Sequence, residues 1–105
     1  MVDLEVDGAT LKLVGDFDVR STGAVRTALY DHLEAHARPC THDIVVDLTD
    51  VPSVDETALR VLAVATRVAE RRGHRLVLRG CCPSVRRMLT LARFRHLVAV
   101  EPVHA

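Results

Sequence analysis

The chain has 105 residues, a length typical of one domain, and 49% of them are hydrophobic. Only 3% are aromatic, so the core is expected to consist of valine, leucine and alanine. No apolar stretch is long enough to span a bilayer and no leader is recognised, which predicts a cytoplasmic protein without membrane insertion. The three cysteines, an odd number, favour reduced thiols.

Opposite charges are unevenly distributed along the chain, although the formal net charge is zero. Residues 1–59 hold twelve acidic and four basic side chains, whereas residues 60–105 hold two acidic and ten basic ones. Such asymmetry marks a binding face in some proteins, and a mixed surface results if folding interleaves the two halves. Both interpretations stay open, with the mixed surface preferred.

The first part of the chain predicts a β-hairpin. Apolar and acidic residues alternate over residues 2–7, as in a half-buried strand, and Gly8-Ala9 predicts a turn. The second strand is expected to begin near Leu11 and to reach Phe17, antiparallel to the first.

The middle of the chain predicts a helix and then a buried strand. Ser21 or Thr22 can cap the helix, whose apolar residues recur at helical spacing to about residue 36. Residues 44–48 form a β-branched run that is too short for a helix and suits a buried strand.

A second helix follows this strand. Asp55 is expected to cap it, and it extends to about Arg72 and stops at Gly73. Glu56 suits the positive end of the helix dipole. Five residues form the predicted core-facing stripe: Leu59, Leu62, Ala63, Thr66 and Ala69.

The last third predicts a short strand at residues 76–78, a helix that begins near Pro83 and an edge strand at residues 97–100. The residues expected to pack on the core here are Val85, Met88, Leu89, Ala92, Phe94 and Leu97. Strands and helices alternate through most of the chain, so an α/β fold is expected.

Three segments resemble signature segments of the STAS domain family, in particular those of its anti-sigma factor antagonists. They are G-D-F-D at residues 15–18, the run from V-V-D-L to V-D-E-T-A-L within residues 45–59, and S-V-R-R-M-L at residues 84–89. The resemblance covers essentially the whole chain and implies one STAS-like domain, residues 1–105, with three helices packed against a small mixed β-sheet. Glu56, Ala58 and Arg93 depart from the family pattern, which has serine, glycine and glycine there.

The resemblance implies a regulatory role. In the antagonists, the residue aligned with Thr57 is phosphorylated by the anti-sigma factor, a serine/threonine protein kinase. The unphosphorylated protein binds that kinase and frees a sigma factor. Asp18, Asp55 and Glu56 are the implied neighbours of this switch residue. An ordinary first-turn threonine, with Asp55 acting only as a helix cap, stays open as the alternative.

The second helix carries a further stripe that predicts a partner-binding surface. Its members are Thr57, Val61, Val64 and Val68 at helical spacing, flanked by Arg60, Arg67 and Arg71. An exposed apolar stripe of this kind marks a site for another protein. Burial of the helix on two sides stays open, as does a homodimer through this stripe or through the final edge strand.

No other chemistry is expected from the sequence. His32 and His36, one helical turn apart, are interpreted as solvated helix-face residues rather than metal ligands, and Cys81-Cys82 lacks the spacing of a zinc site. The sequence contains no phosphate-binding loop and no nucleophile elbow, so neither an enzyme nor a bound cofactor is predicted. The basic last helix lacks the aromatic residues that stack on nucleic acid, so direct nucleic-acid binding is not predicted. The alternative function is a structural STAS module that assembles constitutively with a signalling or transporter partner.

Overall fold

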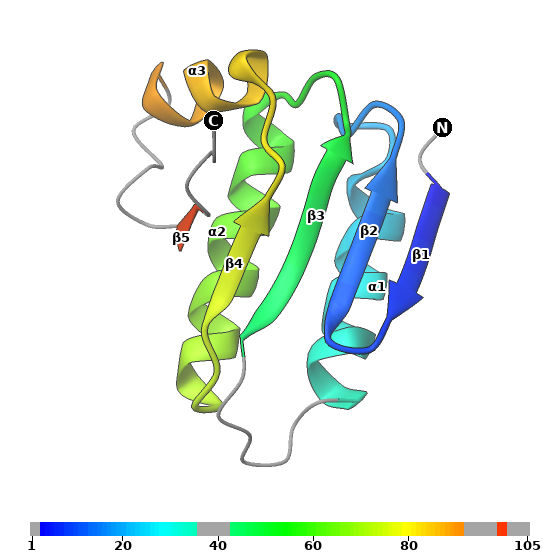
Figure 1. The fold of residues 1–105 in the computed structure, drawn as a ribbon, viewed down its shortest axis with the longest axis vertical. Helices are drawn as coiled ribbons and strands as arrows, with labels where there is room; N and C mark the ends of the chain where they lie inside the picture. The colour runs from blue at the N-terminus through cyan, green and yellow to red at the C-terminus, as the bar shows by residue number, and fades with distance from the viewer. Residues whose placement is uncertain (1–2, 36–42, 92–98, 101–105) are drawn as a thin grey trace.

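A computed structural model describes residues 3–35, 43–91 and 99–100 of the chain. Its elements are β1 (Asp3–Asp7), β2 (Thr10–Val14), α1 (Thr22–Ala35), β3 (Ile44–Asp50), α2 (Glu56–Arg71), β4 (Leu76–Arg79), α3 (Pro83–Leu91) and β5 (Ala99–Val100) (Figure 1). The strands form one sheet in the order β1-β2-β3-β4-β5. β1 is antiparallel to β2, and the other neighbours are parallel. The predicted α/β fold, with three helices and a small mixed sheet, is confirmed.

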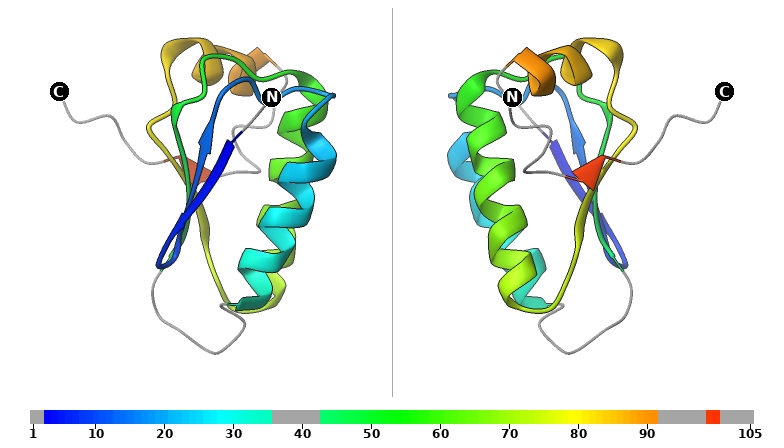
Figure 2. Two further views of the ribbon diagram at one scale, coloured as in Figure 1. Left: turned by 90° about the vertical axis from the view of Figure 1, so that its right-hand side faces the viewer. Right: turned by 90° about the vertical axis from the view of Figure 1, so that its left-hand side faces the viewer.

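The two long helices, α1 and α2, cover the same face of the sheet, as the side views in Figure 2 show. Their N-terminal ends lie at the edge of the sheet where β2, β3 and β4 end, and α3 lies at this edge too (Figure 1). Such an arrangement is expected when parallel strands are connected by helices. It brings the loops before the three helices to one end of the domain.

The core between sheet and helices is aliphatic, as the composition predicts. The stripe predicted on α2 is confirmed, because all five of its residues are buried. From the sheet and α1 come Leu11, Leu13, Val25, Leu29, Leu33, Ile44, Val46, Leu48, Leu76 and Leu78, each no more than 1% exposed. α3 buries Val85 and Leu89, whereas Met88 is only half-buried. Ala92, Phe94 and Leu97 lie outside the described residues.

The prediction that the second strand reaches Phe17 is wrong. β2 ends at Val14, and Gly15, with φ +105°, turns the chain and donates a backbone hydrogen bond of 3.0 Å to Asp50 O. Glycine adopts this conformation without the steric strain of a side chain. Phe17 then forms an isolated parallel bridge with Val54 and is fully buried.

The prediction that the first strand is half-buried is wrong, because all five residues of β1 are exposed. Leu4 and Val6 keep 36% and 67% exposure, because β1 lies at the outer edge of the described sheet (Figure 1).

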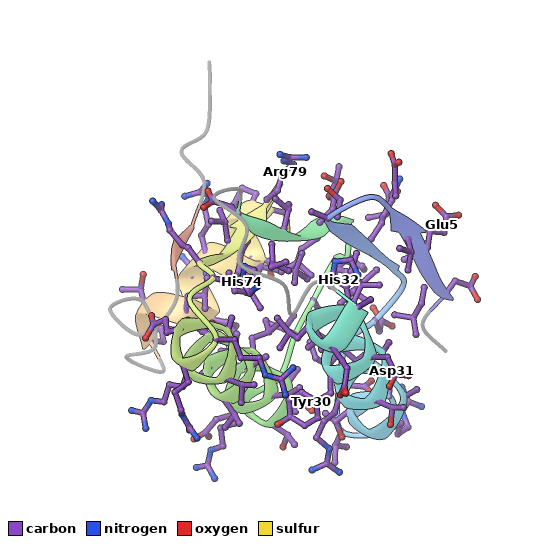
Figure 3. The ribbon with its side chains drawn as sticks, turned by 90° about the horizontal axis from the view of Figure 1, so that it is seen from below. Glu5, Tyr30, Asp31, His32, His74 and Arg79 are labelled. Atoms are coloured by element: carbon purple, nitrogen blue, oxygen red, sulfur yellow. The ribbon has the colours of Figure 1, made fainter. Side chains whose placement is uncertain are left out.

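His32 lies in the core rather than in solvent, contrary to the prediction. It is buried (Figure 3), and its Nε2 lies 3.0 Å from Ala9 O. His32 follows Leu29 by three residues, which places it on the buried face of α1, and the carbonyl group satisfies the ring nitrogen there. His36 lies outside the described residues.

The element ends agree closely with the predictions. α2 ends at Arg71, one residue before the predicted end, and Gly73 follows with φ +80°. The predicted final strand is described only at Ala99–Val100.

Within the described ranges, no helix is both long and apolar enough to cross a membrane.

Candidate functional site

Three loops meet where β2, β3 and β4 end, and we call them together the loop edge: residues 15–21, 51–55 and 80–82. Phe17 N donates a hydrogen bond of 3.3 Å to Ser53 O, which joins the first loop to the second. Cys82 Sγ lies 3.7 Å from Val51 O and 3.6 Å from Pro52 O, which joins the third loop to the second. The carboxyl ends of parallel strands commonly carry the binding sites of α/β proteins. The loop edge is therefore the candidate site.

Asp55 organises this edge with one carboxylate. It has an extended backbone (φ −105°, ψ 178°), and its Oδ1 accepts a hydrogen bond of 2.9 Å from Ala58 N, which makes it the predicted cap of α2. Its Oδ2 accepts a second hydrogen bond of 2.8 Å from Val19 N. Asp55 therefore starts α2 and also holds the first loop against it.

Asp18 lies in that first loop, next to Val19. Its Oδ1 accepts from Arg20 N and its Oδ2 from Arg20 Nη2, each at 3.0 Å. The hydrogen bond from the guanidinium lowers the pKa of the Asp18 carboxyl below its ordinary value. The structure brings Asp18 to the loop edge beside the Asp55 cap, and its proximity to Thr57 stays a prediction.

Thr57 lies in the first turn of α2, and its side chain is exposed. Glu56, which precedes it, is exposed too, and its Oε1 accepts a hydrogen bond of 3.0 Å from Arg60 Nη2 one turn along the helix. The Glu56 carboxylate is thus directed along α2, and Arg60 partly neutralises the negative charge next to Thr57.

Five residues of α2 are predicted to bind a partner: Arg60, Val61, Val64, Arg67 and Val68. We call them, together with Thr57, the α2 stripe. Arg60 and Arg67 are exposed, and Val64 is 48% exposed. Val61 and Val68 are half-buried and pack against the core. Val68 also lines a groove of about 370 Å³ between α1 and α2, together with Tyr30 and Arg72. The apolar part of the stripe is therefore narrower in the structure than in the sequence.

Gly80 is a residue of the loop edge whose role was not predicted from the sequence. It has φ +71°, and a Cβ added there would overlap Thr49 Oγ1 and lie 3.1 Å from Thr49 Cα. Thr49 Oγ1 in turn donates a hydrogen bond of 2.5 Å to Asp47 Oδ1. A glycine directly after a strand is a signal of such a close approach.

The vicinal cysteines belong to the third loop. Both are free thiols. Burial raises the pKa of Cys81 to about 11, so this thiol is protonated at neutral pH and is a poor nucleophile. Cys82 is half-buried. In the part of the chain that the structure describes, no three potential ligands lie close enough together to hold a metal ion.

A family model described as "Mlab, STAS domain" matches residues 1–99. The chain belongs to the STAS-domain family. Curated protein sequences give no match to this STAS domain. Its departure from the family pattern at Ala58 is compatible with the local structure, because Ala58 is a fully buried helical residue whose conformation does not require glycine.

Solved STAS structures share the fold at low sequence identity. An anti-sigma factor antagonist from Mycobacterium paratuberculosis superimposes with a TM-score of 0.77 at 18% identity, over 98% of this chain and 86% of that one. The Bacillus cell fate determinant SpoIIAA in its phosphorylated form gives 0.64 at 14% identity, over 97% and 92%. The STAS domain of a SulP transporter from Vibrio cholerae gives 0.58 at 16% identity, over 94% and 77%. An anti-sigma factor antagonist and the STAS domain of a transporter thus share the fold of this chain.

Proposed function

We propose that this STAS domain is an anti-sigma factor antagonist that binds an anti-sigma factor with serine/threonine kinase activity and loses that partner when Thr57 is phosphorylated. The observation that carries the proposal is the exposed position of Thr57 in the first turn of α2, two residues after the Asp55 cap. An anti-sigma factor antagonist and a phosphorylated protein among the structures with the same fold support it. In this proposal the domain works in the cytoplasm by binding alone, without catalysis or a cofactor.

Phosphorylation at this position is compatible with the fold. A phosphate adds about −1.5 to −2 of charge and three acceptor oxygens. At the start of α2 it meets the positive end of the helix dipole and the backbone amides of the first turn. Because the Thr57 side chain is exposed, the phosphate displaces no buried group. The modification therefore acts on the surface rather than on the stability of the domain.

The change in charge falls on the α2 stripe, which is the proposed docking surface. Arg60 lies three residues after Thr57 and four after Glu56, so its guanidinium can reach either side chain. A doubly charged phosphate competes with the Glu56 carboxylate for this guanidinium. A partner that binds Arg60 and Val64 would then lose a cation and meet a phosphate instead, which weakens the complex.

A constitutive module is the second candidate function. The match to the model described as "Mlab, STAS domain" and the fold shared with a transporter domain favour it. Glu56 favours it too, because it places a negative charge next to Thr57 without any modification. In this case the α2 stripe binds a signalling or transporter partner permanently, and Thr57 is not phosphorylated.

The intact mass of the protein isolated from its own cells distinguishes the two candidates. For the switch we expect an adduct of one phosphate that is absent from a Thr57→Ala variant. Ser53→Ala and Thr27→Ala are matched controls, because both hydroxyl groups are exposed and Ser53 belongs to the same loop edge. The adduct should persist in both controls, and its loss in Ser53→Ala would move the modification away from Thr57.

Proteins that co-purify with each variant complete the test. The switch predicts that Thr57→Ala retains a partner that Thr57→Glu loses. If both variants retain the same partner, and the wild-type protein carries no phosphate under any growth condition, the switch is wrong and the constitutive module is supported.

A further inference from the structure

β1 is an open edge of the described sheet. Among the described strands it pairs with β2 alone, and its five residues, Asp3–Asp7, are all exposed. Hydrogen bonds between antiparallel strands use alternate residues, so the other N–H and C=O groups of β1 point outward. An exposed row of such groups is a template for a further strand.

One face of β1 is apolar and borders a groove. Leu4 and Val6 lie opposite Leu13 and Leu11, so they face the helix layer, yet both are exposed. They line a groove of about 310 Å³ between β1 and α1, whose other residues are Leu11, Ala28, Asp31, His32 and Ala35. The groove is thus mainly aliphatic, and its two polar residues, Asp31 and His32, both belong to α1.

The other face of β1 is acidic. Asp3, Glu5 and Asp7 alternate with the apolar residues, and Glu5 points away from the helices (Figure 3). Lys12 is the register partner of Glu5, but its Nζ binds Asp50 Oδ2 at 3.0 Å. The lysine therefore serves a carboxylate at the end of β3, and the outer edge keeps a negative charge.

We infer that β1 docks an extended segment of another protein in which basic residues alternate with aliphatic ones. The segment adds a strand to the sheet, its aliphatic side chains enter the groove beside Leu4 and Val6, and its lysines or arginines pair with Asp3, Glu5 and Asp7. A second copy of β1 does not fit, because it would set three carboxylates against three carboxylates.

This docking edge is separate from the α2 stripe, since α1 and the central strands lie between them (Figure 1). The inference therefore does not depend on the proposed function, and a partner could occupy each surface at the same time.

The test uses three capped hexapeptides and the full chain. The first peptide alternates lysine with valine, the second alternates glutamate with valine, and the third has three lysines followed by three valines. We expect the first peptide alone to shift the backbone amide signals of β1 and to slow their exchange with solvent. Equal binding of the first and third peptides, shifts confined to α2, or no binding at millimolar concentration would overturn the inference.

A charge-reversed variant separates recognition from misfolding. In Glu5→Lys/Asp7→Lys, affinity for the lysine peptide should fall at least about tenfold, and the glutamate peptide should now bind at β1. That gain requires a folded edge, so a merely unfolded variant cannot produce it. Asp43→Lys/Glu70→Lys has the same net charge with both changes at exposed sites elsewhere, and it should bind like the wild type. Retained lysine-peptide binding in the first variant would contradict the inference.

Discussion

The carboxylate of Asp55 binds the backbone of Val19, 36 residues earlier in the chain, while it caps α2. Its Oδ2 lies 2.8 Å from Val19 N and its Oδ1 lies 2.9 Å from Ala58 N. A cap that acted only locally would need the second bond alone. Because Val19 follows Asp18, one side chain fixes both the start of the helix that carries Thr57 and the loop that carries Asp18.

Substitution of Asp55 separates these two functions. Asp55→Ala removes both hydrogen bonds and is expected to destabilise the domain by about 1–2 kcal/mol, the usual effect of losing an N-cap. Asp55→Asn can still cap through its carbonyl oxygen, but its amide group presents a donor to Val19 N–H. Urea unfolding should therefore show most of the stability restored in the asparagine variant, while exchange of the Val19 amide stays fast. Equal protection of Val19 in all three proteins would contradict the bridging role.

Gly80 is expected to tolerate no side chain. Gly80→Ala forces a positive φ on alanine and places its Cβ against Thr49, so we expect a loss of about 2–3 kcal/mol in urea unfolding. Gly73→Ala is the matched control, because Gly73 also has φ +80° but has open space around its Cα, and it should lose only about 1 kcal/mol. Thr49→Ala should recover part of the loss in the Gly80→Ala background. Equal losses at the two glycines would show that Thr49 moves away without effect.

The pair of Asp18 and Arg20 predicts a specific pH dependence. The guanidinium lowers the pKa of Asp18 in the folded protein below its ordinary value of 3.8. A carboxyl group of this kind contributes stability that is present above the unfolded pKa and is lost as pH falls through the folded pKa. The stability difference between wild type and Arg20→Gln should therefore be constant above about pH 4 and shrink below pH 3.8.

Titration of the Asp18 carboxyl by NMR checks the cause directly. Its pKa should rise toward 3.8 in Arg20→Gln. Lys12→Gln is the control, because Lys12 pairs with Asp50 at the edge of the sheet, and it should leave the Asp18 titration unchanged. An Asp18 pKa that is the same in wild type and Arg20→Gln would assign the shift to another group.

The sequence sufficed for features that depend on local patterns. Helical spacing placed Leu59 and Leu62 in the core, and the position of Asp55 before an apolar run indicated the cap, because both depend on residues within a few turns. The bond from Val19 to Asp55 could not be predicted, since any residue except proline supplies a backbone N–H.

Burial that depends on elements far apart in the sequence could not be predicted from the sequence either. Leu4 and Val6 alternate like core residues, and only the tertiary structure shows that the edge of the sheet leaves them exposed. His32 is polar, which predicts exposure to solvent, yet it lies in the core, where its ring nitrogen forms a hydrogen bond with the carbonyl group of Ala9. Val61 and Val68 are half-buried, although their spacing predicts an exposed stripe, because α2 packs against the core on that side as well.

The last prediction concerns the phosphate itself. In protein prepared with phosphothreonine at position 57, the second pKa of the phosphate, about 6 in the absence of partners, should be lowered by Arg60. Arg60→Gln should raise this pKa, and Glu56→Gln should lower it further, because it frees the guanidinium from its present partner. Phosphorus NMR titration measures each value.

Arg67→Gln, two helical turns beyond Arg60 on the same stripe, is the control and should leave the pKa of the phosphate unchanged. If Arg60→Gln and Arg67→Gln behave alike, Arg60 stays with Glu56 after phosphorylation. The proposed release of the partner would then rest on the added charge of the phosphate rather than on the exchange of an ion pair.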